Sequence, residues 1–317
     1  MSRVSIVVPS YRRPERLERS LDALARQSRP ADEILVVCRR DDAPTHALAG
    51  AAVGVRRVEV REAGVLAAMR AGARAARGDV IGFVDDDAEA RQGWLEGVMA
   101  HLEDPAVGAV GGRDIVDHIP GATPQLDVGR ITAVGKLVGA HHLGIGPARD
   151  VDVLKAANMV FRRPALALPD GLRGAGAQVH FEVATSLWAI DRGWRLVYDP
   201  SLVVDHLAGP RFDDDERGAQ SRDATANAAY NLTICLATLR PSLRHRRLAY
   251  GLLAGDKELP GLLRAGWAVA NRDMRAAGRL RPSIRGQLTA YAELRRDDTT
   301  LRMYTYPSPG SEVAAEA

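Results

Sequence analysis

Three short apolar runs, separated by amphipathic segments, place the strongest constraint on the fold. The runs are VSIVV (4–8), DEILVV (32–37) and DVIGFV (79–84). Each has the length and composition of a strand that is buried on both faces of a sheet. Leu17, Leu21 and Leu24 fall on one face of a helix after the first run, and residues 64–78 form a helical pattern before the third. This alternation predicts an α/β domain with a doubly wound, mostly parallel sheet.

Further strand and helix patterns follow, and the character of the chain changes after Gly209. The predicted elements are a helix at 94–104, a strand at 107–112, a long loop region at 113–150, strand character at 151–163, a helix at 179–194 and two short strands within 195–206. From about residue 221 onward the pattern is helical only. The sequence therefore predicts a domain at 1–210, a helical region at 211–300 and a flexible tail at 301–317.

The charge balance and the cysteines exclude several classes of protein. The 317 residues carry a formal net charge of +3, which is too small to indicate a nucleic-acid partner. Cys38 and Cys235 are far apart in the sequence and are predicted to be reduced and buried. The run at 4–8 is too short for the core of a signal peptide, and no window approaches the roughly 18 apolar residues of a membrane span. These features predict a cytoplasmic protein.

Three consecutive carboxylates, Asp85, Asp86 and Asp87, follow the third apolar run directly. Ligands of open α/β sheets bind outside the carboxyl ends of the strands, which is where this triplet is expected. Adjacent carboxylates raise one another's pKa unless a cation offsets their repulsion, and Mg²⁺ or Mn²⁺ with oxygen ligands would do so. The alternative is a solvated acidic turn that begins the helix at Trp94. The triplet alone does not decide between them.

Five segments in a fixed order resemble family 2 glycosyltransferases. They are VSIVVPSYRRPERLERSLDAL, DEILVV, ARGDVIGFVDDDAEARQGWLE, LKAANMVFRRPAL and FEVATSLWAIDRGWRLVYDPSLVVDH, spread over residues 3–207. The resemblance implies an inverting enzyme with the GT-A fold, a Rossmann-like, mostly parallel doubly wound sheet, followed here by an all-helical C-terminal extension. The segment NAAYNLTICLATL in that extension is similar to bacterial members that act on surface polysaccharide or lipid-linked glycans.

The resemblance assigns the acidic triplet to a metal and nucleotide site. Asp85 would contact the nucleotide ribose and approach the metal, Asp87 would ligate the metal that bridges the diphosphate, and Asp86 would support either. His206 matches a position that supplies a further metal ligand, and its imidazole suits Mn²⁺ better than Mg²⁺. The alternative for His206 is a strand-end histidine bonded to a backbone carbonyl. Asp205 beside it would support the ligand or face solvent.

Glu182 takes the position at which the family carries its general base. Inversion needs one carboxylate to accept a proton from the acceptor hydroxyl as that hydroxyl attacks the anomeric carbon. Partial burial beside Phe181 and Trp188 would make Glu182 a stronger base. The alternative is a carboxylate that only stabilises the N-terminus of its helix.

Residues after the first two strands are predicted to bind the nucleotide. Pro9, Ser10 and Tyr11 lie where the family lines the nucleotide pocket. The usual acidic cluster after the second strand is altered to VVCRRDD, so Asp41 or Asp42 would take over recognition of the base. Arg70 would pair with the diphosphate or, alternatively, be an exposed helical arginine. A second group is predicted to face the sugar or the acceptor: Asn158, His141, His142, Gln178, His180 and Trp188.

The predicted reaction transfers a hexosyl group from a nucleotide-diphosphate sugar to a hydroxyl of a glycan or lipid-linked acceptor. Two alternatives remain, a sugar nucleotidyltransferase and a catalytically inactive nucleotide-sugar-binding scaffold. A nucleotidyltransferase would need a glycine-rich loop after the first strand, whereas this chain has PSYRRPER there. The altered VVCRRDD segment leaves the scaffold open.

The helical region is basic. Residues 240–285 contain eleven Lys and Arg against three Asp and Glu, a local excess of +8. Such helices, with Trp267 among them, would rest on the anionic inner face of the plasma membrane as a peripheral contact. The alternatives are a solvated basic face and a homodimer surface.

Overall fold

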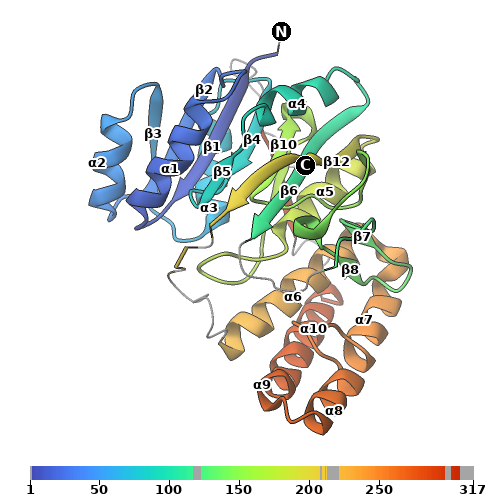
Figure 1. The fold of residues 1–317 in the computed structure, drawn as a ribbon. Coiled ribbons are helices and arrows are strands. Elements are labelled where there is room, and N and C mark those ends of the chain that lie inside the picture. Colours follow the sequence, from blue (N-terminus) through green and yellow to red (C-terminus); the bar gives the residue numbers. More distant parts are fainter. Residues whose placement is uncertain are drawn as a thin grey trace.

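The computed structural model describes residues 2–116, 123–207, 209–210, 212, 221–296 and 301–307. Within these residues the chain forms a mixed sheet with helices on both faces, joined to a lobe of helices (Figure 1). The helices of that lobe lie on the side toward which β6 (Val107–Val116) and β12 (Arg195–His206) run. This arrangement confirms the predicted α/β fold with a helical C-terminal region.

The described part of the sheet has nine strands, of which eight run in the order β3-β2-β1-β4-β10-β6-β12-β5, while β9 pairs with β12. Their bounds, besides β6 and β12, are β1 (Val4–Ser10), β2 (Glu33–Arg39), β3 (Val55–Val60), β4 (Val80–Val84), β5 (Ala88–Ala90), β9 (Arg149–Asp150) and β10 (Asn158–Arg162). Strands β1, β2, β3 and β4 run parallel to one another, and β12 runs parallel to β6. Strand β10 is antiparallel to both β4 and β6.

Helices cover both faces because alternate residues of a strand point to opposite sides. The helices of the sheet region are α1 (Pro14–Ala25), α2 (Ala43–Ala51), α3 (Val65–Ala75), α4 (Trp94–His101) and α5 (Phe181–Asp191). Ile6 and Val8 of β1 share one buried cluster with Leu17 of α1 and Trp94 of α4. Val7 belongs to a second cluster, with side chains of α3 and α5. Burial on both faces explains why the parallel strands read as continuous apolar runs.

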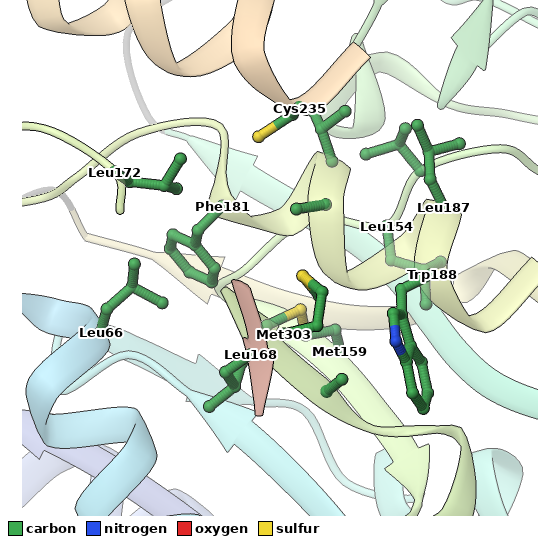
Figure 2. Packing of buried hydrophobic residues seen from close by; sticks show 14 of the residues in the cluster. Leu66, Leu154, Met159, Leu168, Leu172, Phe181, Leu187, Trp188, Cys235 and Met303 are labelled. Carbon is green, nitrogen blue, oxygen red and sulfur yellow. The ribbon is translucent and has the colours of Figure 1, made fainter. Parts of the chain in front are cut away.

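Two of the C-terminal helices, α6 (Arg222–Leu239) and α10 (Leu280–Leu294), contribute side chains to the second of these cores. Between them in the sequence lie α7 (Arg244–Leu253), α8 (Leu262–Ala270) and α9 (Met274–Gly278). Helix α6 packs against α5, and Figure 2 shows Cys235 of α6 close above the α5 helix that carries Phe181 and Leu187. The helical lobe therefore completes the sheet domain's core and is not a separate unit attached to it.

Residues 301–307 differ from the predicted flexible tail. Strand β13 (Arg302–Thr305) pairs antiparallel with β11 (Ala167–Asp170). Leu301 and Met303 alternate along the strand and are both buried, and Met303 lies in the core beside β11 (Figure 2). This two-residue alternation was the available sequence signal for a strand. Residues 308–317 of the predicted tail lie outside the described residues.

Other element boundaries differ from the predictions as well. Strand β6 runs on to Val116, and the described part of the predicted loop at 113–150 also contains β7 (Arg130–Ile131), β8 (Leu137–Val138) and the 3-10 helix η1 (His141–Leu143). Residues 195–206 form one strand with a register shift between Asp199 and Val203, where Pro200 lacks a backbone donor. Two further 3-10 helices are η2 (Arg163–Ala165) and η3 (Pro241–Leu243). In the described ranges, no helix combines the length and apolar character needed to cross a bilayer.

The shared core predicts that α6 contributes strongly to stability. Leu232 of α6 is 1% exposed, so Leu232→Ala should lower the free energy of unfolding by about 2–5 kcal/mol in chemical denaturation. Leu263 of α8 is 72% exposed, and the matched variant Leu263→Ala should change it by less than about 0.5 kcal/mol. Equal effects of the two substitutions would contradict this description of the core.

Candidate active site

One cleft gathers residues from the ends of β1, β4 and β12 and from the first turns of α3 and α5, with a cavity volume of about 200 Å³. Of the residues that the sequence predicts for the site, those lining it are Pro9, Ser10, Tyr11, Asp85, Asp87, Glu182 and His206. The cleft lies outside the carboxyl ends of parallel strands, which is where α/β sheets of this kind bind ligands.

Asp85, Asp87 and His206 form a compact cluster in the cleft. One ligand atom from each lies within 4.8 Å of the others. Sheet pairing produces this proximity, because β5 follows the acidic turn and pairs antiparallel with β12, which sets His206 opposite Ala88. The backbone N–H of Leu207 also donates to the carbonyl of Asp87 at 2.8 Å. Residues about 120 positions apart in the chain are thus fixed side by side.

Arg13, which the sequence analysis did not single out, binds two of the three carboxylates. Its Nε and Nη2 lie 3.1 Å and 2.6 Å from the two carboxylate oxygens of Asp86, and its Nη1 donates to Asp87 Oδ2 at 2.9 Å. Ser10 donates to Asp86 Oδ2 at 2.7 Å, and the N–H of Gly209 donates to Asp87 Oδ2 at 2.7 Å. Asp87 Oδ1 instead lies 3.2 Å from His206 Nε2. The one available signal for Arg13 was its position just after the first strand.

Burial raises the pKa of two of the acidic side chains. For Asp86, burial outweighs the Arg13 guanidinium and raises the pKa to about 7. For Asp85, burial and then the charge of Asp87 raise the pKa. Burial also opposes ionisation of Asp87, but hydrogen bonding to His206 and the charge of Arg13 hold its pKa well below the ordinary value. The triplet thus ends in one firmly ionised carboxylate, Asp87, and the two before it are destabilised as anions.

His206 is held among carboxylates from two strands. Burial alone would lower its pKa, but Asp114 of β6 and Asp87 raise it to about 9. Asp114 is buried, and its pKa is lowered in spite of burial because of its interaction with His206. Asp114 was not predicted as a site residue, and its only local signal was a carboxylate two residues after the Gly-Gly pair of its strand.

Asp85, Asp87 and His206 fit a divalent cation. Carboxylate oxygens with one imidazole suit Mn²⁺, and the oxygens also suit Mg²⁺. The raised pKa values of Asp85 and Asp86 show that the protein's own cations leave buried negative charge incompletely balanced. A divalent ion at this place would supply the missing positive charge.

Glu182 lies in the first turn of α5, half-buried, and lines the same cleft as Asp87 and His206. The preceding His180 caps the helix in a left-handed conformation, with φ at 76°. Phe181 and Glu182 both line the cleft, so the N-terminus of α5 borders it. Both roles considered for Glu182, proton acceptor and helix-end charge, are compatible with this placement.

An aromatic and cationic wall lies on the β1 and β2 side of the cleft. The ring of Tyr11 meets Phe212 edge to face, with centroids 5.7 Å apart. The Arg39 guanidinium lies over the same Tyr11 ring, 4.0 Å from its centroid. Lys155, just before β10, adds a further cation to the lining. The sequence analysis missed Lys155 and Phe212, because neither belongs to a local motif.

Two of the predicted nucleotide-binding residues face away from the lining of the cleft. Asp42 is buried and caps α2 by accepting from the Thr45 N–H, so its carboxylate holds a helix end. Arg70 was expected at the diphosphate, but its guanidinium pairs with Asp170 of β11 at 2.9 Å. Asp41 is half-exposed behind the aromatic wall, where it accepts from the Tyr11 hydroxyl at 3.2 Å. Asp41 therefore contacts two residues that line the cleft, Tyr11 and Arg39, whose Nε lies 3.4 Å from Asp41 Oδ1.

The residues predicted to face the sugar or acceptor also lie mostly outside the described lining. Asn158 is fully buried and satisfied, because it accepts from Trp94 Nε1 at 2.8 Å and donates to the Leu202 carbonyl at 2.9 Å. His141 is buried against Tyr198, with its Nε2 2.8 Å from the Val153 carbonyl. These two side chains are structural in this arrangement, since tertiary partners use their polar atoms.

The remaining members of that group have similar positions. His142 offers its backbone carbonyl to Arg113 Nε at 2.9 Å. Trp188 is buried in the core and stacks under Arg192, at 3.6 Å from the ring centroid. Gln178 and His180 both have positive φ in the turn before α5. This turn abuts Gly64, where any added Cβ would lie 2.6 Å from Gln178 Oε1.

Comparisons with known proteins agree with the fold and the site region. Residues 5–140 match the family model described as Glycosyl transferase family 2. The pre-mycofactocin glycosyltransferase of Mycobacterium tuberculosis is 31% identical over 147 residues, which is 45% of this chain and 30% of that protein. The chain therefore spans less than a third of the curated relative's length.

Two solved structures share the fold over nearly the whole chain. The mannosyltransferase PcManGT from Pyrobaculum calidifontis, in complex with GDP-Man and Mn²⁺, aligns over 94% of this chain and 88% of its own, with a TM-score of 0.54 and 20% identity. S. aureus TarS 1-349, in complex with UDP-GlcNAc, aligns over 99% of both chains, with a TM-score of 0.56 and 13% identity. The predicted resemblance is confirmed: residues 5–140 match family 2 of the glycosyltransferases, and the chain has the GT-A fold.

Proposed function

We propose that the protein is a divalent-metal-dependent, inverting glycosyltransferase. It moves a hexosyl group from a nucleotide-diphosphate sugar to a hydroxyl of a glycan or lipid-linked acceptor. The observation that carries this proposal is the single cleft in which the Asp85, Asp87 and His206 cluster and the Glu182 carboxylate both take part. The match to family 2 and the GT-A fold support the same reaction class.

The cleft offers separate surfaces for the two ends of the donor. Tyr11 and Phe212 provide aromatic area against which a nucleobase can stack, and the Arg39 guanidinium lies over the Tyr11 ring. The diphosphate would lie by the Asp85, Asp87 and His206 cluster, with Lys155 as a nearby cation. The two solved relatives named above hold GDP-Man and UDP-GlcNAc, which supports a nucleotide-sugar donor without choosing the base.

Asp85, Asp87 and His206 would hold Mn²⁺ or Mg²⁺, which would stabilise the negative charge that grows on the leaving diphosphate. Arg13 keeps Asp87 oriented by occupying Oδ2, so that Oδ1 stays directed toward His206. Asp86 does not line the cleft, and its bonds to Ser10 and Arg13 fix the turn from behind. The acidic turn is thus held rigid before a donor arrives, which lowers the reorganisation needed during reaction.

Glu182 is the proposed proton acceptor. The acceptor hydroxyl oxygen forms a bond to the anomeric carbon while the bond from that carbon to the diphosphate oxygen breaks. The hydroxyl proton passes to the Glu182 carboxylate, and the electron pair of the broken bond leaves with the nucleoside diphosphate. Attack from the face opposite the leaving group inverts the anomeric centre, as in inverting glycosidases, in which a carboxylate activates the nucleophile.

Removing the proposed base should abolish turnover while leaving the donor bound. Glu182→Gln keeps the side chain's size but cannot accept the proton, so kcat should fall on the order of 10²-fold or more. The assay is release of nucleoside diphosphate, with the donor first found by a thermal-shift screen of sugar nucleotides with Mn²⁺. Glu103→Gln, at an exposed position outside the cleft, is the control and should retain wild-type turnover. Near-normal turnover of Glu182→Gln would remove this residue from the mechanism.

Removing the charge of Asp87, the last carboxylate of the triplet, should weaken metal-dependent donor binding. Asp87→Asn preserves shape but removes the charge of the most firmly ionised member of the triplet, so the Mn²⁺ affinity should fall at least about tenfold in calorimetric titration. Nucleoside diphosphate binding measured with Mn²⁺ should fall with it. Asp127→Asn, exposed and outside the cleft, is the matched control. Unchanged titrations for Asp87→Asn would place the metal elsewhere.

A further inference from the structure

Helix α8 turns an apolar face to the outside of the molecule. Only Ala265 and Ala268 of its nine residues are buried, and both point into the helical lobe. Leu263 and Trp267 lie one helical turn apart on the opposite side, 72% and 64% exposed. Arg264 is the single charged residue of the helix. A surface helix ordinarily shows the reverse pattern, with its polar side in water.

The neighbouring helices extend this apolar area. Helix α8 packs against both α7 and α9. Leu253, the last residue of α7, and Met274, the first of α9, are both exposed. We call these side chains together the α8 surface: Leu253, Leu262, Leu263, Trp267, Val269 and Met274. Exposed large apolar side chains gathered in this way mark an interaction site more often than a plain solvated face.

The charges around the α8 surface are mainly positive. Arg264, Arg272 and Arg275 are exposed and pair with no carboxylate in the part of the chain that the structure describes. The nearby acidic residues are already engaged. Asp273 caps α9 through the Ala276 N–H, and Glu258 pairs with Arg279 at 2.8 Å. Asp273 keeps its negative charge as it caps α9, but the three arginines outnumber it, so the local charge beside the α8 surface is net positive.

We propose that the α8 surface docks on an anionic lipid bilayer. Leucine, valine and methionine side chains would enter the boundary between head groups and acyl chains, and the arginines would bind lipid phosphates. Trp267 suits this depth, because its indole has an apolar body and a polar N–H. Helix α8 would lie in the plane of the membrane, which agrees with its length of only nine residues.

A second copy of the chain is a poorer occupant of the same surface. In a symmetric dimer the same patch meets itself, so Arg264, Arg272 and Arg275 would approach their own copies. Like charges brought together at an interface oppose association. An anionic bilayer presents the opposite charge, and its phosphates accept hydrogen bonds from guanidinium groups. The α8 surface shares no residue with the cleft, so docking goes beyond the proposed function and does not depend on it.

Trp267 provides a direct reporter of docking. The other three tryptophans, Trp94, Trp188 and Trp194, are buried or partly buried, so the exposed indole that can change environment is Trp267. Vesicles of phosphatidylglycerol and phosphatidylcholine in equal parts should shift the full-length protein's emission to the blue and sediment it. Phosphatidylcholine vesicles should do neither, and added salt should weaken the effect. Absence of sedimentation with anionic vesicles overturns the proposal.

Variants separate the α8 surface from the general basic charge of the protein. Leu263→Ser combined with Trp267→Ser should lower vesicle partitioning at least about tenfold, since two anchoring side chains are lost. Arg272→Gln combined with Arg275→Gln should lower partitioning to anionic vesicles and flatten its salt dependence. Val53→Ser, a fully exposed apolar side chain between α2 and β3, is the matched control and should bind as wild type.

The altered side chains are exposed, and thermal unfolding can check that each variant is folded. A change in vesicle binding can therefore be assigned to the α8 surface. Wild-type partitioning of the Leu263→Ser and Trp267→Ser double variant overturns the proposal. A second result would also overturn it: light scattering shows a dimer for the wild type and a monomer for the double variant, and the wild type does not bind vesicles. A second copy of the chain would then cover the α8 surface. Nucleotide-sugar turnover without vesicles should stay unchanged in the double variant, which keeps failure of docking distinct from failure of catalysis.

Discussion

The structure of the site depends on holding three adjacent carboxylates in a largely buried turn. An uncompensated charge in such a place costs several kcal/mol, so the fold must bring positive groups to it. Arg13 reaches the triplet from the end of β1, and His206 reaches it from the end of β12. Even so, burial raises the pKa of Asp86 to about 7. We propose that a bound cation supplies the positive charge that the protein's own side chains do not provide at this turn.

The topology of the sheet explains why this site and the proposed base meet. Strand β10 lies antiparallel between β4 and β6, and β12 then runs parallel to β6, so the ends of β4 and β12 open to one edge. Strand β5 returns along β12 and closes the turn that carries the triplet. Helix α5 starts at the same edge and brings Glu182 into the cleft. Residues drawn from distant parts of the sequence are therefore assembled by strand order and not by a local motif.

Much of this could be predicted from the sequence, where the signal was local. The apolar runs became β1, β2 and β4 because a strand buried on both faces must be apolar throughout. Asp85, Asp87, Glu182 and His206 were placed through family resemblance and do share a cleft. Arg13 and Asp114 were missed because their roles exist only through partners on other strands.

The predicted site residues that lie outside the cleft lining have a common physical feature. Arg70, Asn158 and His141 are polar residues whose hydrogen bonds are taken by tertiary neighbours, and no spacing in the sequence announces those neighbours. A polar side chain in the right segment is as often a satisfied structural group as a ligand contact. The apolar face of α8 could not be located from the sequence either, because the composition of a helix does not show which of its sides the fold will cover.

The central claim is that a divalent cation carries the donor's diphosphate at the acidic turn. The most direct measurement is a crystal structure grown with Mn²⁺ and a nucleoside diphosphate, with anomalous diffraction used to locate manganese. We expect one manganese peak in the cleft. The ion should be bonded to Asp87, His206 and phosphate oxygens, and the nucleobase should lie against Tyr11. A diphosphate bound in the cleft without manganese, or manganese bound away from these side chains, would contradict it.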